Sequence, residues 1–275
     1  MAFFYRVKVI LFFVIVIISC KEEPPVLNFV LAGHAYGHPL EDTYGIAPNL
    51  KKYLQEEKKD FVFFLGDFVR IPDSTSFQNL LSDIEPLELD KYFVPGNHDV
   101  INQEEYKKYI GDNYYTITKK GLKFIVLDGN VDNWNIKGEQ LKLLKNELMN
   151  FQGKIFILVH QIIWIGDDKY SDILPNSYDG MSDSLSFWTE LFPILKEYEN
   201  EIYVCAGDLG AFKSIKNPTY HKVGNVTLIA SGMGARYRDN CIDVKLMHNG
   251  DIEFEIISLQ EDLDFDDLED YNLEN

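Results

Sequence analysis

The chain has 275 residues, of which 46% are hydrophobic and 25% are charged. It can therefore bury a sizeable core in one large domain or two small ones, and its composition is not that of a disordered protein. The formal net charge is −18. We expect no non-specific nucleic-acid binding, because an acidic surface repels phosphates.

The first twenty residues read MAFFYRVKVILFFVIVIISC, with Arg6 and Lys8 followed by an apolar run to Ile18. This layout is typical of a secretory signal. We expect a signal peptide at 1–19, a lipidated Cys20 in a bacterial lipoprotein box and a tether at 20–25. An uncleaved membrane anchor is the alternative, since the run is only slightly short of a span. Either interpretation predicts a cell-envelope protein, periplasmic or on the cell surface, with a membrane as partner.

The remaining chain alternates strand-like and helix-like patterns in its first half and is mostly strand-like in its last third. Several strand-like runs are apolar throughout, as expected of strands covered on both faces. This order predicts one α/β domain with two sheets at 26–258. Helices are expected at 43–58, 137–151 and 184–198, the last broken at Pro193.

Three further features concern the C-terminal half. The last fifteen residues hold eight acidic and no basic side chains, which predicts a disordered acidic tail at 259–275. Cys205 and Cys241 lie in apolar runs, where an oxidising compartment permits a disulfide but two buried thiols fit equally. The segment after His160 is long enough to border a pocket, and its Tyr178 could set substrate choice.

Five apolar strand-like runs end in a side chain that can bind a metal. These side chains are His34, Asp67, Asn97, His160 and Asp208. Ligands of α/β sheets gather outside the carboxyl ends of the strands. Carboxylate, amide oxygen and imidazole are ligands that divalent ions accept, so the pattern predicts a metal site.

A family resemblance rests on three blocks and one histidine. The blocks are GDFVR at 66–70, GNHD at 96–99 and AGDLG at 206–210, and the strand-end His160 lies between the last two. In order and spacing they resemble the blocks of the calcineurin-like metallophosphoesterases, which include purple acid phosphatases. The resemblance covers roughly residues 26–258. It implies a four-layer α/β/β/α fold, in which helices flank a two-sheet β-sandwich, and a two-metal phosphatase site.

The resemblance also implies roles for individual residues. Asp67 would bridge two metals, and the second metal would take Asn97 and His160. His98 would stay off the metal, where it stabilises the phosphoryl charge or protonates the leaving oxygen. Asp99 would orient His98. Arg70 would either contact a phosphate oxygen or form an ion pair with a carboxylate.

Two blocks depart from the family pattern. The first should read Gly-Asp-x-His-Gly, but this chain reads GHAYG at 33–37, so His34 and Tyr36 take the ligand positions. The last should read Gly-His-x-His, but this chain reads GDLG at 207–210, so Asp208 and Gly210 take them. One carboxylate and one imidazole have changed places, which keeps the carboxylate count and favours a reorganised metal site.

We therefore expect one well-occupied metal at Asp67, Asn97, His160 and Asp208. A second ion, if present, would use His34, Asp67 and Tyr36, with His38 as an alternative to His34. The metal would be Mn, Fe, Zn or Mg. The expected function is hydrolysis of a phosphate ester, with a phosphorylated substrate, by a lipid-anchored enzyme. The alternatives are a non-catalytic envelope binding protein on a degenerate fold and a one-metal hydrolase of another ester.

Overall fold

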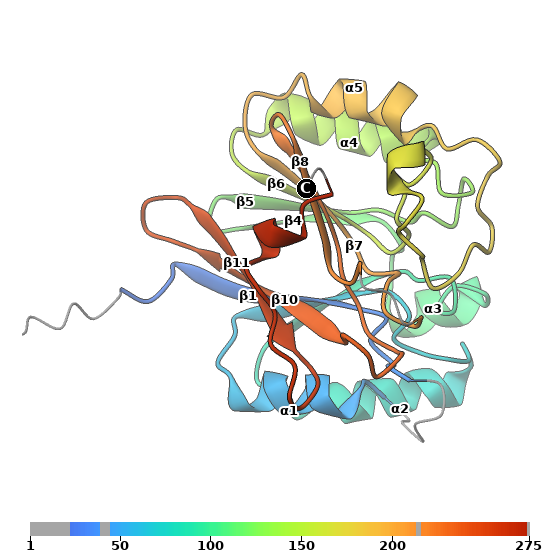
Figure 1. The fold of residues 1–275 in the computed structure, drawn as a ribbon. Helices are drawn as coiled ribbons and strands as arrows, with labels where there is room; N and C mark the ends of the chain where they lie inside the picture. The colour runs from blue at the N-terminus through green and yellow to red at the C-terminus, as the bar shows by residue number, and fades with distance from the viewer. Residues whose placement is uncertain (1–22, 39–44, 213–215, 274–275) are drawn as a thin grey trace, which may run out of the picture.

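The computed structural model describes residues 23–38, 45–212 and 216–273. The expected signal peptide and Cys20 lie outside these ranges. Two sheets pack face to face, and helices cover the outer face of each (Figure 1). The four-layer α/β/β/α prediction is confirmed.

The first sheet has three parallel strands joined at one side by an antiparallel pair. Its order is β11 (Ile252–Ser258), β10 (Asn240–Leu246), β1 (Leu27–Gly33), β2 (Phe61–Leu65) and β3 (Asp90–Val94). The helices that follow its parallel strands are α1 (Pro48–Glu56), α2 (Ser74–Ile84) and α3 (Gln103–Tyr109).

The second sheet has four parallel strands between two antiparallel edges. Its order is β4 (Tyr115–Lys119), β5 (Leu122–Val126), β6 (Ile155–Val159), β7 (Ile202–Ala206), β9 (Val226–Ala230) and β8 (Thr219–Val223). Its helices are α4 (Gly138–Asn150), η1 (Asp168–Tyr170), η2 (Phe187–Leu191) and α5 (Phe192–Leu195), and η3 (Leu268–Tyr271) lies near the C-terminus.

The central strands β2 and β6 are apolar throughout because both of their faces are buried. In β1, Phe29 and Leu31 face the core between the sheets, whereas Val30 and Ala32 face the core under α1 and α2. The ring of Phe29 lies 5.2 Å from that of Phe124 in the opposite sheet, edge to face. Such aromatic pairs add to the burial of apolar area in joining the sheets.

The observed helices match the predicted ones in part. The helix at 137–151 is confirmed as α4, and the predicted break near Pro193 appears as a change from the π-helix η2 to α5. The first helix begins only at Pro48, a residue that favours the first helical turn. The sequence reasoning missed α2, although Asp73 caps it by accepting a hydrogen bond from the Ser76 amide at 2.8 Å.

Cys205 and Cys241 are both buried free thiols. Cys205 lies in the core between the sheets, and Cys241 lies in the core under α1 and α2, so the first sheet separates them. Within the ranges given above, none of the helices combines the length and the hydropathy that a membrane span needs.

The C-terminal segment differs from the expected disordered tail. Leu268 is fully buried in the core between the sheets, and the Leu273 amide donates a hydrogen bond to the Tyr220 carbonyl at 3.1 Å. The Arg238 guanidinium lies 4.7 Å from the Phe265 ring centroid. Apolar residues spaced among the acidic ones therefore dock this segment, while the carboxylates face water.

This docking makes Leu268→Ala a test of the segment. Removing a fully buried leucine side chain should lower the free energy of unfolding by about 2–5 kcal/mol. The neighbouring Glu269→Ala, at an exposed position, should change it by less than about 0.5 kcal/mol. Urea unfolding followed by circular dichroism measures both, and equal effects of the two substitutions would contradict the docking.

Candidate metal centre

The centre lies where the carboxyl end of β2 in one sheet meets those of β6 and β7 in the other. Two glycines permit this approach. A Cβ on Gly207 would lie 2.1 Å from the Leu65 carbonyl oxygen, and a Cβ on Gly66 would lie 2.3 Å from Nδ1 of His160. Gly66 also has a φ of 83°, which L side chains rarely adopt.

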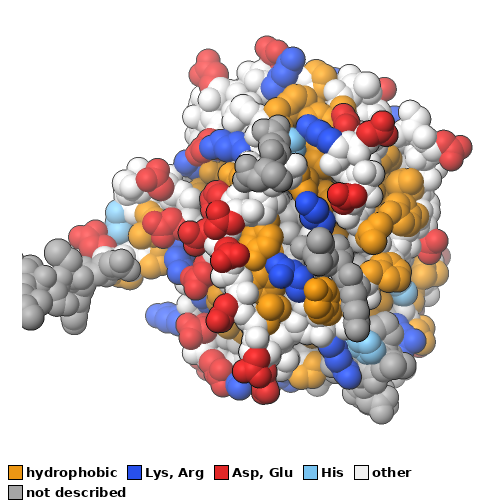
Figure 2. Space-filling model, in the orientation of Figure 1, with side chains coloured by type: hydrophobic (Ala, Val, Ile, Leu, Met, Phe, Trp, Pro, Cys, Tyr) orange, Lys and Arg blue, Asp and Glu red, His pale blue; other side chains and the backbone are white. Residues whose placement is uncertain are grey.

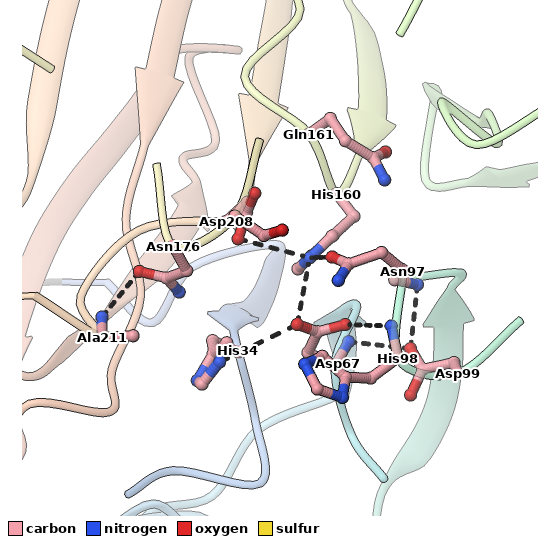
Figure 3. Close-up of polar contacts among 12 residues, drawn as sticks. His34, Asp67, Asn97, His98, Asp99, His160, Gln161, Asn176, Asp208 and Ala211 are labelled. Atoms are coloured by element: carbon pink, nitrogen blue, oxygen red, sulfur yellow. Dashed lines mark hydrogen bonds and ion pairs between the residues drawn. The ribbon is translucent and has the colours of Figure 1, made fainter. Parts of the chain in front are cut away.

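Asp67, His160 and Asp208 form a buried group whose ligand atoms all lie within 4.8 Å of one another. Nε2 of His160 lies 3.4 Å from Oδ2 of Asp67 and 3.5 Å from Oδ1 of Asp208 (Figure 3). Oδ1 of Asn97 lies 3.2 Å from the same nitrogen. Four of the five strand-end residues therefore point toward one small volume.

The donor set suits a divalent cation. Nδ1 of His160 bonds to the Leu65 carbonyl oxygen at 2.7 Å, an interaction that orients the ring and leaves Nε2 directed at the carboxylates. Both carboxylate oxygens of Asp208 are buried, and neither forms a hydrogen bond of ordinary geometry among the residues that the structure describes. The His160 ring and the backbone amides of Asn176 and Ser177 lie close enough only to oppose the rise in its pKa. A buried carboxylate without such hydrogen bonds is costly unless a cation compensates it. Two carboxylates, one imidazole and one amide oxygen are ligands of Mn, Fe, Zn and Mg.

The ionisation of these groups is strongly coupled. Burial disfavours a charged His160, but Asp67 and Asp208 outweigh it and raise the pKa of His160 to about 10. Burial raises the pKa of Asp208 to about 8, although His160 opposes this. Burial would also raise the pKa of Asp67, but His160 and His34 together hold it well below its ordinary value. The His160 imidazolium thus compensates the negative charge of the carboxylates, a role that a metal ion would otherwise take.

His34 and Tyr36 lie beside this group. Nε2 of His34 is 3.8 Å from Oδ2 of Asp67, and burial lowers the pKa of His34 to about 4, so its imidazole is neutral as a metal ligand must be. The Tyr36 ring packs 4.3 Å from the ring of His34 and 5.5 Å from that of His98. Burial, then Asp67, raise the pKa of Tyr36 well above its ordinary value, so Tyr36 is a neutral phenol.

His98 is half-buried at the edge of the centre. Its amide donates to Oδ1 of Asp67 at 3.1 Å, and its Nδ1 bonds to the Arg70 carbonyl oxygen at 3.0 Å. Arg70 itself is exposed.

The carboxylate of Asp99 bonds to the backbone, which differs from the expectation that it orients the His98 ring. It accepts hydrogen bonds from the amides of Gly96, Asp67, Phe68 and Val69 at 2.7 to 3.1 Å. Burial and the nearby Asp67 raise the pKa of Asp99, whereas these amides favour its charged form. Asp99 thus holds the backbone that carries Asp67 and reaches His98 only through it.

His38 lies apart from the group around Asp67. It lines a cavity of about 520 Å³ together with Asn49, Arg236 and Gln260. The geometry therefore favours His34 over His38 as the histidine of the first strand end.

The sequence reasoning missed two residues of the centre. Gln161 directly follows His160, and its buried Oε1 has no hydrogen-bond partner within the described residues, so the strand-end pattern could have included it. Asn176 comes from the long segment after β6. Its backbone amide donates a hydrogen bond to the backbone carbonyl of Asp208 at 3.0 Å, and its side-chain Oδ1 accepts one from the Ala211 amide at 2.6 Å. No spacing in the sequence signals Asn176.

Metal binding should release protons. Below about pH 8, a metal that binds chelator-treated protein must displace one proton from Asp208 and one from His160, because both pKa values lie above the solution pH. The apparent affinity for Mn²⁺ should therefore rise about 100-fold per pH unit between pH 6 and 8, and about tenfold per unit above pH 8.

Calorimetry in buffers of different ionisation enthalpy counts the protons released. Asp208→Asn should release one proton where the unsubstituted protein releases two. An affinity that does not change between pH 6 and 8 would show that these two groups do not hold the metal.

The solved structures with a similar fold are distant. A predicted phosphoesterase from Streptococcus pneumoniae shares 12% identity, with 85% of this chain and 90% of that chain covered and a TM-score of 0.38. A single mutant of Vps29 from Entamoeba histolytica shares 10%, with 84% and 99% covered and a TM-score of 0.41. A cold-active protein-tyrosine phosphatase from a Shewanella species shares 12%, with 83% and 80% covered and a TM-score of 0.36.

No curated protein matches the sequence. A family model does match: that of the calcineurin-like phosphoesterases, over residues 38–232. The matched range includes Asp67, Asn97, His160 and Asp208, which supply the buried donor atoms described above. The chain therefore belongs to the calcineurin-like phosphoesterase family.

Proposed function

We propose that the protein hydrolyses a phosphate ester with a divalent cation held by Asp67, His160 and Asp208, assisted by Asn97. The observation that carries this proposal is the Asp208 carboxylate, which is fully buried 3.5 Å from His160 and forms no hydrogen bond of ordinary geometry in the described part of the chain. A bound cation would supply Lewis-acid polarisation of a phosphoryl oxygen and would lower the pKa of water.

The protein's own residues provide orientation and a proton. The bond from Nδ1 of His98 to the Arg70 carbonyl leaves Nε2 on the open side of the ring. A protonated His98 can therefore donate from Nε2 to the leaving oxygen, or stabilise charge on the phosphoryl group. Arg70 is exposed, and its charge acts on the neighbouring Tyr36, so its guanidinium lies near enough to the centre to contact a phosphate oxygen. Asp99 acts as a positioning residue through the backbone amides that it binds.

His98→Ala should leave the metal content unchanged and lower turnover of phenyl phosphate by about 10²–10⁴-fold, since the leaving oxygen loses its acid. The loss should be smaller for 4-nitrophenyl phosphate, whose better leaving group needs less proton transfer. His248→Ala is the matched control, because His248 is exposed and bonds to the Pro24 carbonyl instead. Unchanged turnover of both substrates would remove His98 from the mechanism.

The same assay separates the non-catalytic alternative. The non-catalytic alternative predicts that the purified protein retains a tightly bound transition metal yet hydrolyses none of a set of phosphate monoesters and diesters. That result would contradict the proposed activity while leaving the metal centre intact.

We further propose that Cys20 is lipidated and that the protein is anchored in the cell envelope. The support is the basic start, the apolar run and the cysteine at the expected cleavage position. Cys20→Ser should abolish incorporation of labelled palmitate and release the protein from the membrane fraction. If the Cys20→Ser protein stays membrane-bound at its full precursor length, the uncleaved-anchor alternative is correct.

A further inference from the structure

Most of the large hydrophobic side chains exposed in the described part of the chain lie on loops after the carboxyl ends of strands, the edge at which the metal centre lies. The described residues include eight that are well exposed, and seven of them follow the carboxyl end of a strand. Six of these define what we call the apolar rim: Ile71, Ile101, Val131, Leu174, Tyr178 and Phe212. The seventh, Tyr237, follows β9, and the eighth, Met149, lies on α4 away from the strand ends.

This placement is not the scatter expected of a surface. Single exposed hydrophobic residues are normal, but they have no reason to favour one edge of two sheets. Figure 2 shows apolar side chains along the right-hand edge of the molecule, and in Figure 1 the loops that follow the parallel strands lie on this edge.

The rim is joined to the metal centre by short connections. Ile71 directly follows Arg70, whose carbonyl bonds to His98, and Ile101 lies two residues beyond Asp99. Phe212 directly follows Ala211, whose amide bonds to Asn176.

Tyr178 lies two residues from Asn176, on the same loop, and its ring stacks parallel to that of Trp134 at 6.5 Å. Five of the six rim residues therefore lie on the loops that also carry or hold Asp67, His98 and Asp208, and Val131 lies on the loop after β5. A phosphoryl group bound at the centre must extend its ester substituent outward past these loops.

We propose, on the basis of the proposed function, that the substrate is a phosphate ester with an extended apolar leaving group, which lies on the apolar rim. In the reaction, a water oxygen forms a new bond to phosphorus, and the bond from phosphorus to the ester oxygen breaks. The apolar alcohol leaves with a proton, and inorganic phosphate is the second product.

The test compares 4-pentylphenyl phosphate with 4-methylphenyl phosphate, which have similar phenol leaving groups and differ by four methylenes. Partial burial of those methylenes should raise kcat/KM for the pentyl substrate about tenfold or more. The Tyr178→Ser, Phe212→Ser double variant should reduce this ratio to below about threefold.

Met149→Ser is the control, because Met149 is 73% exposed but lies outside the rim, and it should keep the full ratio. Affinities for the two matched phosphonates, measured by calorimetry, give a second readout that needs no turnover. Hydrolysis of both phosphates with equal kcat/KM would overturn the rim proposal and leave the proposed function standing. Absence of hydrolysis, together with tighter binding of the pentyl phosphonate, would overturn the proposed function and leave the rim proposal standing.

An apolar phosphate ester could be a free amphiphile or a lipid headgroup. A further arm measures phosphate release from phosphatidate in phosphatidylcholine vesicles. Release from the vesicles would identify a lipid as a source, whereas the chain-length preference without vesicle hydrolysis would identify the free amphiphile. Either result supports the apolar leaving group.

Discussion

The metal centre depends on the packing of the two sheets, which buries opposing charges where their strand ends meet. Asp67 ends a strand of one sheet, and His160 and Asp208 end strands of the other, so the centre exists only while the sheets stay packed. The aromatic core between the sheets supplies that packing, and the glycines before Asp67 and Asp208 permit the close approach. Hydrophobic burial therefore fixes the distance at which the charges interact, and this distance sets the pKa values of the site.

The backbone around Asp67 is strained, and Asp99 holds it in place. Asp67 has a φ of 52°, in the left-handed region that non-glycine residues seldom occupy. His34, at the end of the neighbouring strand, has the same φ. Three of the four amides bound by Asp99 belong to the turn after β2, and the fourth, that of Gly96, follows β3. These bonds fix the turn, so the Asp67 carboxylate faces His160 rather than solvent. Strain of this kind persists where the surrounding contacts determine the conformation, as they do at functional sites.

The sequence predicts the four layers of the fold from the order of its strand-like and helix-like runs. It predicts most of the metal centre from the residues at which the strands end. Parallel strands bring their carboxyl ends to one edge, so Asp67, Asn97, His160 and Asp208 could be grouped without coordinates. The bonds made by Asp99 and Asn176 could not, because they join a side chain to the backbone of a distant loop, and backbone geometry leaves no residue pattern. The docked C-terminal segment was missed for a different reason, since composition weighs its many carboxylates and overlooks the single buried Leu268.

The exchange of carboxylate and imidazole has a direct electrostatic consequence. Next to His160, Asp208 places a carboxyl group that becomes negatively charged when a cation displaces its proton, while the first strand end carries a His34 that burial keeps neutral. Beside His34, Tyr36 is a protonated phenol, and Gly210 has no side chain to offer. A cation beside His160 would therefore have two carboxylates, those of Asp67 and Asp208. A cation beside His34 would have only the shared carboxylate of Asp67. We infer that the reorganised centre favours one cation between Asp67 and Asp208, because a second would have a single carboxylate to balance its charge.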